Sequence, residues 1–471
     1  MFDWILANPY TVVGLLLPIV IPLVVFQILP LLVLIERRGA AFIQDRAGPN
    51  RAYIYIPVIG VKLRAFGMIY NATDAVKLLF KENFIPPFVH KGWYLFAPGI
   101  PVITGLLGLA LIPWFSPVLY AAGAAGDSVG RLSGQMIEAN SGLLMLFAIG
   151  SLGVYGVVLG SWASNSKYSL LGGMRASAMM ISYEVSMGLS VMGMLLLVGS
   201  LGLTDVVEWQ GAHTWGIFVQ PIGFLLFLVS MFAECNRNPF DVAEGESEIV
   251  AGFHTEFNGV KFMTFMTAEY LHVIAASILL ATVYLGGYQL LPMPLPLDGL
   301  QAPWVTLDTL WLKQHLGIVV ALMLAGAGAG LLGFAYLLVG RRRTYQNNAA
   351  NDALKAERAK EYGLYIAAFS LLGLGMLAGA AASALLMNTK VLATTIGSTV
   401  VFPGWVNAVT GFVQFNILIG KALLFCWLFV WVRWTLPRFR YDQIMALGWK
   451  VMLNIALVNL LATAVIAKLV R

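Results

Sequence analysis

Residues 10–35 read YTVVGLLLPIVIPLVVFQILPLLVLI and contain no charged side chain. A helix rises about 1.5 Å per residue, so about 20 apolar residues cross the roughly 30 Å hydrocarbon core of a membrane. The run is also too long for the apolar part of a cleaved signal peptide, and residues 1–9 hold no Lys or Arg. This stretch therefore predicts a helix that spans a membrane.

The rest of the chain has the same character. Of its 471 residues, 59% are hydrophobic and 11% are charged, whereas a soluble domain carries about 25% charged residues. A soluble protein of this length needs more polar cover than this sequence provides. We therefore expect residues 1–471 to form a single integral membrane domain.

Ten apolar segments are long enough to cross a membrane, which predicts an all-α, polytopic transmembrane helix bundle. The segments are approximately 10–35, 95–119, 141–162, 178–200, 216–234, 263–289, 316–340, 363–388, 410–432 and 448–468. The segment 62–82 instead mixes charged and apolar residues at helical spacing. We expect it to form an amphipathic helix at the membrane surface.

The distribution of basic residues predicts the orientation. If the loop 36–94 lies inside, the inside loops and their edges hold most of the 29 Lys and Arg. Both termini then lie outside, and only an even number of spans keeps this alternation. The inside stretch 341–362, RRRTYQNNAANDALKAERAKEY, is expected to be a solvated charged linker.

No metal or redox centre is expected in this chain. Cys235 and Cys426 are too few for a disulfide framework or a four-thiolate cluster. The five histidines show no pair at ligand spacing on one helix; they are His90, His213, His254, His272 and His315. Each is expected to be a polar loop or packing residue.

A GxGxxG pattern starts at Gly328, but it lies inside an apolar span and follows no strand. Small residues at this spacing, including Gly326 and Gly330, allow two transmembrane helices to approach closely. The pattern therefore predicts helix packing and not a dinucleotide site.

Carboxylates are costly inside a membrane, and they mark an ion path or a paired structural site. Glu184, Glu234 and Glu269 lie within or at the ends of predicted spans. For each one alone, a structural hydrogen bond to a neighbouring helix is as good an explanation as a functional role.

The loop 234–256, ECNRNPFDVAEGESEIVAGFHTE, adds further acids, and only Arg237 opposes them. A solvated acidic loop is the usual explanation for such a run. Here the acids alternate with apolar residues that favour burial, and glycines allow tight turns. These residues are Pro239, Phe240, Val242, Ile249, Val250 and Phe253, with Gly245 and Gly252 at the turns. Carboxylates held together in this way titrate as a coupled set, which is what a proton path needs.

Several blocks resemble one family, the quinone-site membrane subunit of the proton-pumping NADH:quinone oxidoreductases (respiratory complex I). In chain order they are LIERRGAAFIQDRAGPN (34–50), DAVKLLFKENFIPP (74–87), R-x-x-x-x-x-ISYE (175–184), FAECNRNPFDVAEGESEIVAGFHTEFNG (232–259), FMTAEY (265–270) and WVRWTLPRFRYDQIMALGWK (431–450). The resemblance covers residues 1–290 and 405–471.

The resemblance implies a tilted helix bundle in which five helices are related to half of an antiporter-like subunit. It implies that Glu36, Arg37 and Asp74 line a quinone tunnel or its mouth. It also implies an acidic path that couples quinone reduction to proton pumping. The residues matching that path are Glu184, Glu234, Glu244, Glu246, Glu248, Glu256 and Glu269.

The resemblance also implies the surroundings of the chain. Quinone would be the substrate, no cofactor would be bound covalently, and FMN and iron–sulfur clusters would lie in partner subunits. The expected partners are peripheral-arm quinone-site and iron–sulfur subunits, antiporter-like and small membrane subunits, quinone and lipid, with no nucleic acid. The expected location is the bacterial plasma (inner) membrane.

The chain departs from the family pattern in three places. Residues about 291–404 have no counterpart and contain two extra spans, which we expect to contact a lipid or an additional subunit. Ala178-Met179 stands where the family has Ala-Gln, and Leu453-Asn454 stands where it has Leu-Pro. No acid of the path is lost by these changes.

Two other functions remain open from the sequence. The homologous membrane subunit of a proton-coupled, membrane-bound hydrogenase would need no quinone tunnel. A self-sufficient secondary transporter predicts an internal repeat with interrupted helices, and no convincing repeat is found. The complete loop block and the RAGPN block favour the complex I subunit.

Overall fold

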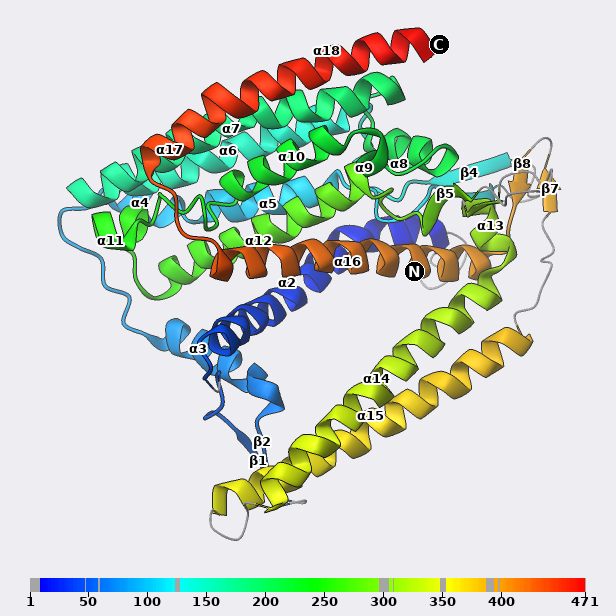
Figure 1. The fold of residues 1–471 in the computed structure, drawn as a ribbon, viewed down its shortest axis with the longest axis horizontal. Coiled ribbons are helices and arrows are strands. Elements are labelled where there is room, and N and C mark those ends of the chain that lie inside the picture. The colour runs from blue at the N-terminus through cyan, green and yellow to red at the C-terminus, as the bar shows by residue number, and fades with distance from the viewer. Residues whose placement is uncertain are drawn as a thin grey trace.

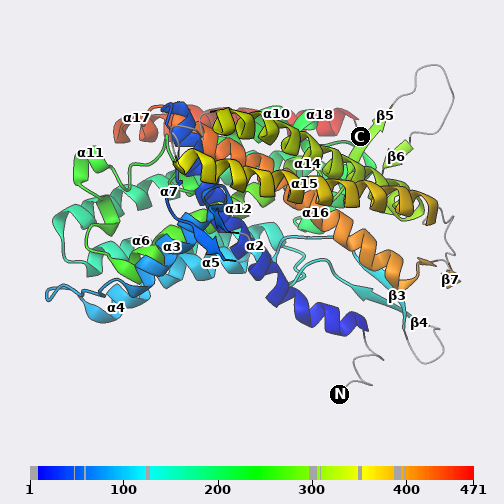
Figure 2. The same cartoon turned by 90° about the horizontal axis from the view of Figure 1, so that it is seen from below.

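The computed structural model describes residues 9–470, apart from 47, 58–59, 123–127, 296–304, 308, 348–352, 387–393 and 397–398. Long helices lie side by side along the long axis of the molecule (Figure 1). Helix α2 (Pro9–Ile43) begins and helix α18 (Leu453–Val470) ends at the same end of the bundle (Figures 1 and 2). This arrangement agrees with an even number of crossings.

The predicted all-α, multi-pass architecture is confirmed, because nine helices in the described part are long and apolar enough to span a membrane. They are α2, α4 with α5 (Lys91–Phe96 and Gly99–Ala110), α6 (Gly142–Ala163), α7 (Lys167–Val198), α12 (Gly259–Tyr284), α14 (Leu316–Asn347), α15 (Ala353–Leu386), α16 (Gly404–Thr435), and α17 (Tyr441–Ala446) continuing through a π-helical segment (Leu447–Met452) into α18.

The fifth predicted span, 216–234, is shorter than expected. In place of one helix over 216–234, the chain forms α9 (Gly216–Val219) and α10 (Pro221–Glu234). A helix of 14 residues is about 21 Å long, which is less than the thickness of the hydrocarbon core. The backbone that follows α10 is therefore placed within the protein, where the acidic loop begins.

Four antiparallel hairpins, four short α-helices and two 3₁₀ helices (Ala65–Gly67 and Gly252–His254) complete the described fold. The hairpins are β1 (Ile54–Ile56) with β2 (Val61–Leu63), β3 (Val118–Ala122) with β4 (Ser128–Leu132), β5 (Leu291–Leu295) with β6 (Val305–Leu307), and β7 (Thr394–Ile396) with β8 (Thr399–Val401). The short α-helices are α3 (Met68–Phe80), α8 (Leu203–Ala212), α11 (Glu246–Ile249) and α13 (Thr309–Gln314). The expected span 95–119 was too long, since its helix ends at Ala110 and β3 follows.

The surface helix begins later than predicted. Residues 62–63 belong to β2, and α3 starts at Met68. Gly67 before it has φ +96°, and a Cβ there would lie 2.6 Å from the carbonyl oxygen of Pro49. Glycine is needed at this break because it alone tolerates both the left-handed backbone and the close approach.

The core lies where α7, α10, α12 and α16 meet. The rings of Phe232 in α10 and Phe429 in α16 pack with centroids 4.1 Å apart and their planes tilted by 34°, and Tyr183 and Tyr284 are fully buried. Many large apolar side chains instead face outward along the helices, for example Leu461, which is 66% exposed. An apolar outer surface is what a bundle surrounded by lipid presents.

Helices α14 and α15 form a long hairpin that diverges from the main bundle (Figure 1). They pack closely at Gly328, where a Cβ would lie 2.8 Å from the carbonyl oxygen of Gly373. The helix-packing interpretation of the glycine pattern is confirmed, but the choice of Gly326 and Gly330 was wrong, because a Cβ at either meets nothing within 4 Å.

The charged stretch 341–362 is not a solvated loop. Helix α14 extends to Asn347 and α15 begins at Ala353, and Glu361 is buried. The prediction failed because acids at helical spacing in this stretch have basic partners far away in the sequence, on β2 and just after it.

Lys421 of α16 binds the backbone that follows the C-terminal end of α12. Its Nζ donates hydrogen bonds to the carbonyl oxygens of Leu285 (2.6 Å), Gly287 (2.9 Å) and Gln289 (2.5 Å). We expect Lys421→Met to lower the free energy of unfolding by about 1–3 kcal/mol, because buried carbonyls lose their donor. The thermal midpoint of the purified protein measures this loss. An unchanged midpoint would show that water replaces the ammonium.

Candidate functional site

A buried group of charged side chains lies at the centre of the bundle. Arg237, which follows α10, places Nη1 3.2 Å from Glu36 of α2 and Nε 2.8 Å from Glu269 of α12. The Nη1 of Arg433 in α16 lies 2.6 Å from the other oxygen of Glu36, and Tyr270 donates its hydroxyl to Glu36 at 3.0 Å. The side chains of Arg237 and Glu36 are only 4% and 9% exposed.

Two guanidinium groups thus face two carboxylates, so the charges balance within the group. The guanidinium of Arg237 also lies over the ring of Tyr270, 4.3 Å from its centroid. Buried charges persist only when they are paired and hydrogen-bonded, and removal of one partner leaves another charge uncompensated. We call Glu36, Arg237, Glu269, Tyr270 and Arg433 the central ion network.

The loop after α10 packs against the bundle, as its apolar residues predict. Pro239, Phe240, Val242, Ile249 and Phe253 are buried or partly buried, whereas Val250 is exposed. Gly252 has φ +57°, and a Cβ there would lie 1.8 Å from the carbonyl oxygen of Ala243. The glycine therefore permits a turn that no other residue fits.

Burial of this loop changes the proton affinity of its side chains. It raises the pKa of Asp241 to about 6, against the opposing effect of Arg438, whose Nη2 lies 2.8 Å away. It lowers the pKa of His254 to about 4. His254 is therefore neutral near pH 7, and its Nδ1, 3.8 Å from Glu244, forms no ion pair there.

Two adjoining cavities continue from the central ion network. The first, about 480 Å³, is lined by Glu269, Glu244 and Glu234, and the second, about 620 Å³, is lined by Glu234 and Glu184. Both are also lined by Cys235 and His272. Four of the predicted path acids thus line two neighbouring cavities that share Glu234, and Glu269 of the network lines the first of them.

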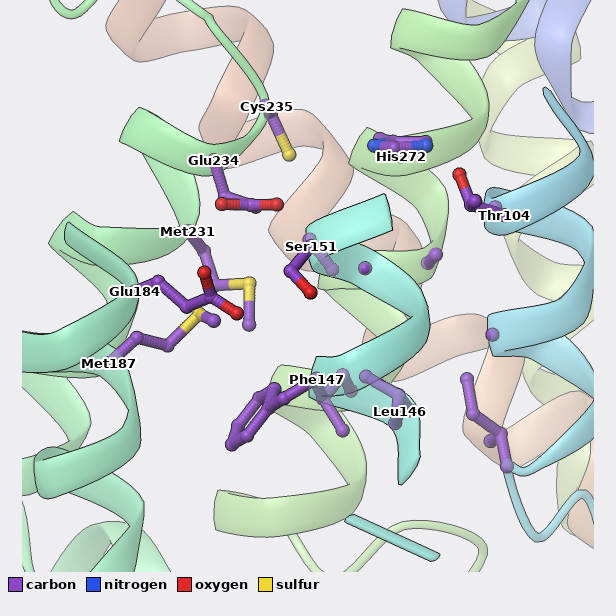
Figure 3. A pocket seen from close by; sticks show the side chains of 17 residues that line it. Thr104, Leu146, Phe147, Ser151, Glu184, Met187, Met231, Glu234, Cys235 and His272 are labelled. Carbon is purple, nitrogen blue, oxygen red and sulfur yellow. The ribbon is translucent and has the colours of Figure 1, made fainter. Parts of the chain in front are cut away.

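Figure 3 shows the second cavity. The carboxylates of Glu184 on α7 and Glu234 on α10 point toward the same space, and Ser151 and His272 lie across it. Met187, Met231 and Phe147 complete an otherwise apolar wall. An ordered water needs about two to four polar partners, and these four polar side chains supply them, so a water in this cavity could carry a proton between the two carboxylates.

Two other predicted path acids, Glu248 and Glu256, do not line these cavities. Glu248 is 45% exposed and pairs with Arg175 of α7 at 2.6 Å. Glu256 accepts the hydroxyl of Tyr94 through its backbone oxygen at 2.6 Å and lines neither cavity. The side chain of Glu246 lies outside the described part of the chain.

The three predicted tunnel residues lie in two different places in the structure. Glu36 belongs to the central ion network, but the next residue, Arg37, points outward and pairs with Asp74 of α3 at 2.5 Å. Arg37 lines an open hollow of about 920 Å³ with Tyr70, Trp434 and the loop that contains Arg46 and Arg51. Successive residues of a helix point about 100° apart, so neighbours in sequence face different surroundings.

Comparison with known proteins identifies the family. The family model described as NADH dehydrogenase matches residues 15–329 and 371–464. The chain belongs to this family. The match omits residues 330–370, which include the ends of α14 and α15 that face each other across the linker.

Curated relatives are named as the H subunit of NADH-quinone oxidoreductase. One from Bdellovibrio bacteriovorus is 35% identical over 473 residues, covering 96% of this chain and 95% of the relative. Another, from Cytophaga hutchinsonii, carries the same name with the number 1; it is 32% identical and covers 91% and 89%. A third, from Geobacter sulfurreducens, carries the number 2; it is 34% identical and covers 94% of both. The chain is therefore a membrane subunit of an enzyme complex, and no set of His, Cys, Asp and Glu among its described residues could hold a metal ion.

Sequence reasoning did not name four residues of this NADH dehydrogenase family member as site residues. Arg237 was noted only as the basic residue that opposes the acids of the loop. Arg433 and Tyr270 lie within the blocks WVRW and FMTAEY, and Arg438 lies three residues after the end of α16 at Thr435. A buried carboxylate in the second half of a span needs a cation from another span. That requirement could have directed attention to Arg433, although it could not have chosen Glu36 as its partner.

Proposed function

We propose that this chain forms the membrane side of the quinone chamber of a proton-pumping NADH:quinone oxidoreductase, and that it begins the proton path of the membrane arm. The observation that carries the proposal is the central ion network opening onto cavities lined by Glu244, Glu234 and Glu184. The names of the relatives supply the reaction class.

The hollow at Arg37 suits the entry of a quinone. It combines Tyr70 and Trp434, which contact an apolar ring or tail, with a guanidinium that donates to a carbonyl oxygen. Reduction of a quinone to a quinol adds two electrons and two protons. We propose that the electrons arrive from an iron–sulfur cluster of a peripheral-arm subunit, with FMN further upstream, since no such centre is expected in this chain.

The central ion network is suited to respond to that reduction. A change of charge beside it alters how Glu36 and Glu269 share the positive charge of Arg237. A proton taken up at Glu269 can then pass along Glu244, Glu234 and Glu184 toward antiporter-like subunits. Glu248 and Glu256 are not required by this path, since they line neither cavity.

We also propose an orientation. The end of the bundle that carries α3, β1 and β2 lies inside, where the basic residues gather, and both termini lie outside in a bacterial plasma membrane. The peripheral arm would then dock beside the hollow at Arg37.

Arg37→Ala tests the quinone site. We expect about a tenfold or greater loss of NADH:quinone turnover at limiting quinone, the effect of one charged hydrogen bond. NADH oxidation by an artificial acceptor that takes electrons from the peripheral arm should not change.

Asp74→Asn is the matched control, because it breaks the same half-exposed ion pair but keeps the guanidinium. It should cost little activity. Equal losses in both variants would mean that Arg37 acts only by holding α3, and the quinone role would be wrong.

A further inference from the structure

A second basic site lies where the α14–α15 hairpin meets the rest of the chain. A cavity of about 590 Å³ is lined by Arg38 of α2, Arg64 after β2, Arg341 of α14 and Arg358 of α15. Tyr345 and Tyr362 also line it. The proposed function uses none of these residues.

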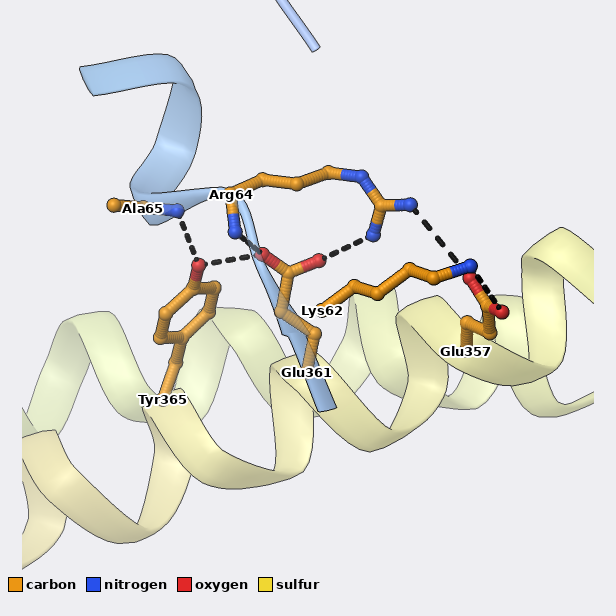
Figure 4. A network of polar contacts seen from close by, with 6 residues as sticks. All are labelled: Lys62, Arg64, Ala65, Glu357, Glu361 and Tyr365. Carbon is orange, nitrogen blue, oxygen red and sulfur yellow. Dashed lines mark hydrogen bonds and ion pairs between the residues drawn. The ribbon is translucent and has the colours of Figure 1, made fainter. Parts of the chain in front are cut away.

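Only one of the four arginines is neutralised by an acid of this cavity. Glu361 accepts hydrogen bonds from the backbone nitrogen of Arg64 (2.6 Å), from its Nη1 (2.9 Å) and from the hydroxyl of Tyr365 (2.6 Å) (Figure 4). The neighbouring Glu357 pairs with Lys62 at 2.9 Å. Both acids of α15 are thus engaged with β2 and the residue after it.

The other three arginines have no carboxylate within ion-pair distance among the described residues. The Nε of Arg38 is buried and has no hydrogen-bond partner in the protein. The charges of Arg341 and Arg358 act unfavourably on that of Arg38. Arg38 and Arg358 do lie over aromatic rings, 5.9 Å from Phe66 and 5.8 Å from Tyr345.

Three positive charges around one cavity repel one another, and one buried N–H donor has no acceptor in the protein. An anion that offers several acceptor oxygens would stabilise this arrangement. A phosphate group meets this requirement, because guanidinium groups donate to its oxygens in pairs. A single carboxylate would neutralise only part of the positive charge and would leave some of the N–H donors without an acceptor.

The setting of the cavity favours a lipid phosphate. The hairpin exposes large apolar side chains beyond it, such as Leu337 (67% exposed) and Leu371 (71% exposed), which acyl chains would cover. Tyrosines at the polar end of a span are typical of the headgroup level. Basic cavities between transmembrane helices on the inner side bind anionic headgroups.

We propose that this cavity binds the headgroup phosphate of an anionic phospholipid, whose acyl chains lie along α14 and α15. The lipid would join the hairpin to α2 and to the loop that contains Gly48 and Asn50. These two residues line both this cavity and the hollow at Arg37. The lipid would therefore lie beside the proposed quinone entrance, although the inference does not depend on that function.

The test uses the purified, delipidated complex. Binding of phosphatidylglycerol in detergent micelles is followed by native mass spectrometry, with phosphatidylcholine as the zwitterionic comparison. We expect tight binding of the first lipid only. Arg341→Gln with Arg358→Gln should weaken it about thirtyfold, from about 1 kcal/mol per basic residue and 1.4 kcal/mol per tenfold change.

Two further variants distinguish loss of this binding site from a general loss of positive charge. Arg343→Gln removes the same charge from the exposed end of α14, outside the cavity, and should leave binding unchanged. Arg341→Lys with Arg358→Lys keeps the charge and should retain most of the affinity. Unaltered binding in the double Gln variant, or an equal loss in Arg343→Gln, would overturn the proposal.

Inorganic phosphate distinguishes the source of the anion. Displacement of phosphatidylglycerol only at concentrations far above that of the lipid supports a site that also uses the acyl chains. Displacement at equal concentration would show a free-phosphate site, and the lipid assignment would be wrong.

Discussion

Arg237→Gln is expected to lower the free energy of unfolding by about 3–5 kcal/mol, because Glu36 and Glu269 would remain buried without their shared cation. This is a large part of the stability of a folded domain. The assembled complex should become scarce in membranes, and its remaining fraction should reduce quinone slowly. Complex abundance on native gels and the thermal midpoint measure the effect.

Arg175→Gln is the matched control. It removes the same kind of group from an ion pair whose Glu248 is 45% exposed, so it should cost no more than about 1 kcal/mol. The combination Arg237→Gln with Glu269→Gln should recover part of the loss, since it removes a charge from each side. A normal midpoint for Arg237→Gln alone would show that the central ion network contributes no stability.

Glu234→Gln is expected to reduce quinone turnover and proton pumping together, by about tenfold or more, the range seen when a proton-transferring group is lost. Glutamine keeps the size and hydrogen bonding of the side chain but cannot titrate. Glu234 is the only one of the predicted path acids that lines both cavities among the described residues, so the proposed path passes through it. Both rates are measured in sealed vesicles that contain the purified complex.

Glu248→Gln provides the comparison for this prediction. Its carboxylate lies at the surface beside Arg175, outside both cavities, and we expect turnover and pumping to stay close to those of the unaltered protein. Electron transfer to a peripheral acceptor should be normal in both variants. Full pumping by Glu234→Gln would exclude the proposed path, whereas a strong loss in Glu248→Gln would show that it runs along the loop surface.

The contrast between Glu234 and Glu248 shows how far the acidic loop could be interpreted from its sequence. Alternation of acids with Phe240, Val242 and Phe253 correctly predicted that the loop packs against the helices. It did not show which carboxylates turn inward, because that depends on the local turns at Gly245 and Gly252. The structure places four of the seven predicted path acids around the two cavities, and the path itself stays a prediction.

The α14–α15 hairpin shows that contacts between residues far apart in the sequence also could not be predicted. Two extra apolar helices were predicted from residues 316–340 and 363–388, and α14 and α15 are present. The acids of the linker were expected to be solvated, yet Glu361 is buried against Arg64, almost 300 positions away in the chain. No local pattern in either segment marks the other as its partner.

The sequence by itself determined the membrane class, the approximate spans and the family, because the cost of burying polar groups in lipid acts on each segment separately. Only the tertiary structure decided that Glu36 meets Arg237 and Arg433 while its neighbour Arg37 faces α3. The direction of a side chain is set by the rotation and tilt of its helix. These depend on packing against every neighbouring helix at once, which the sequence of one helix does not contain.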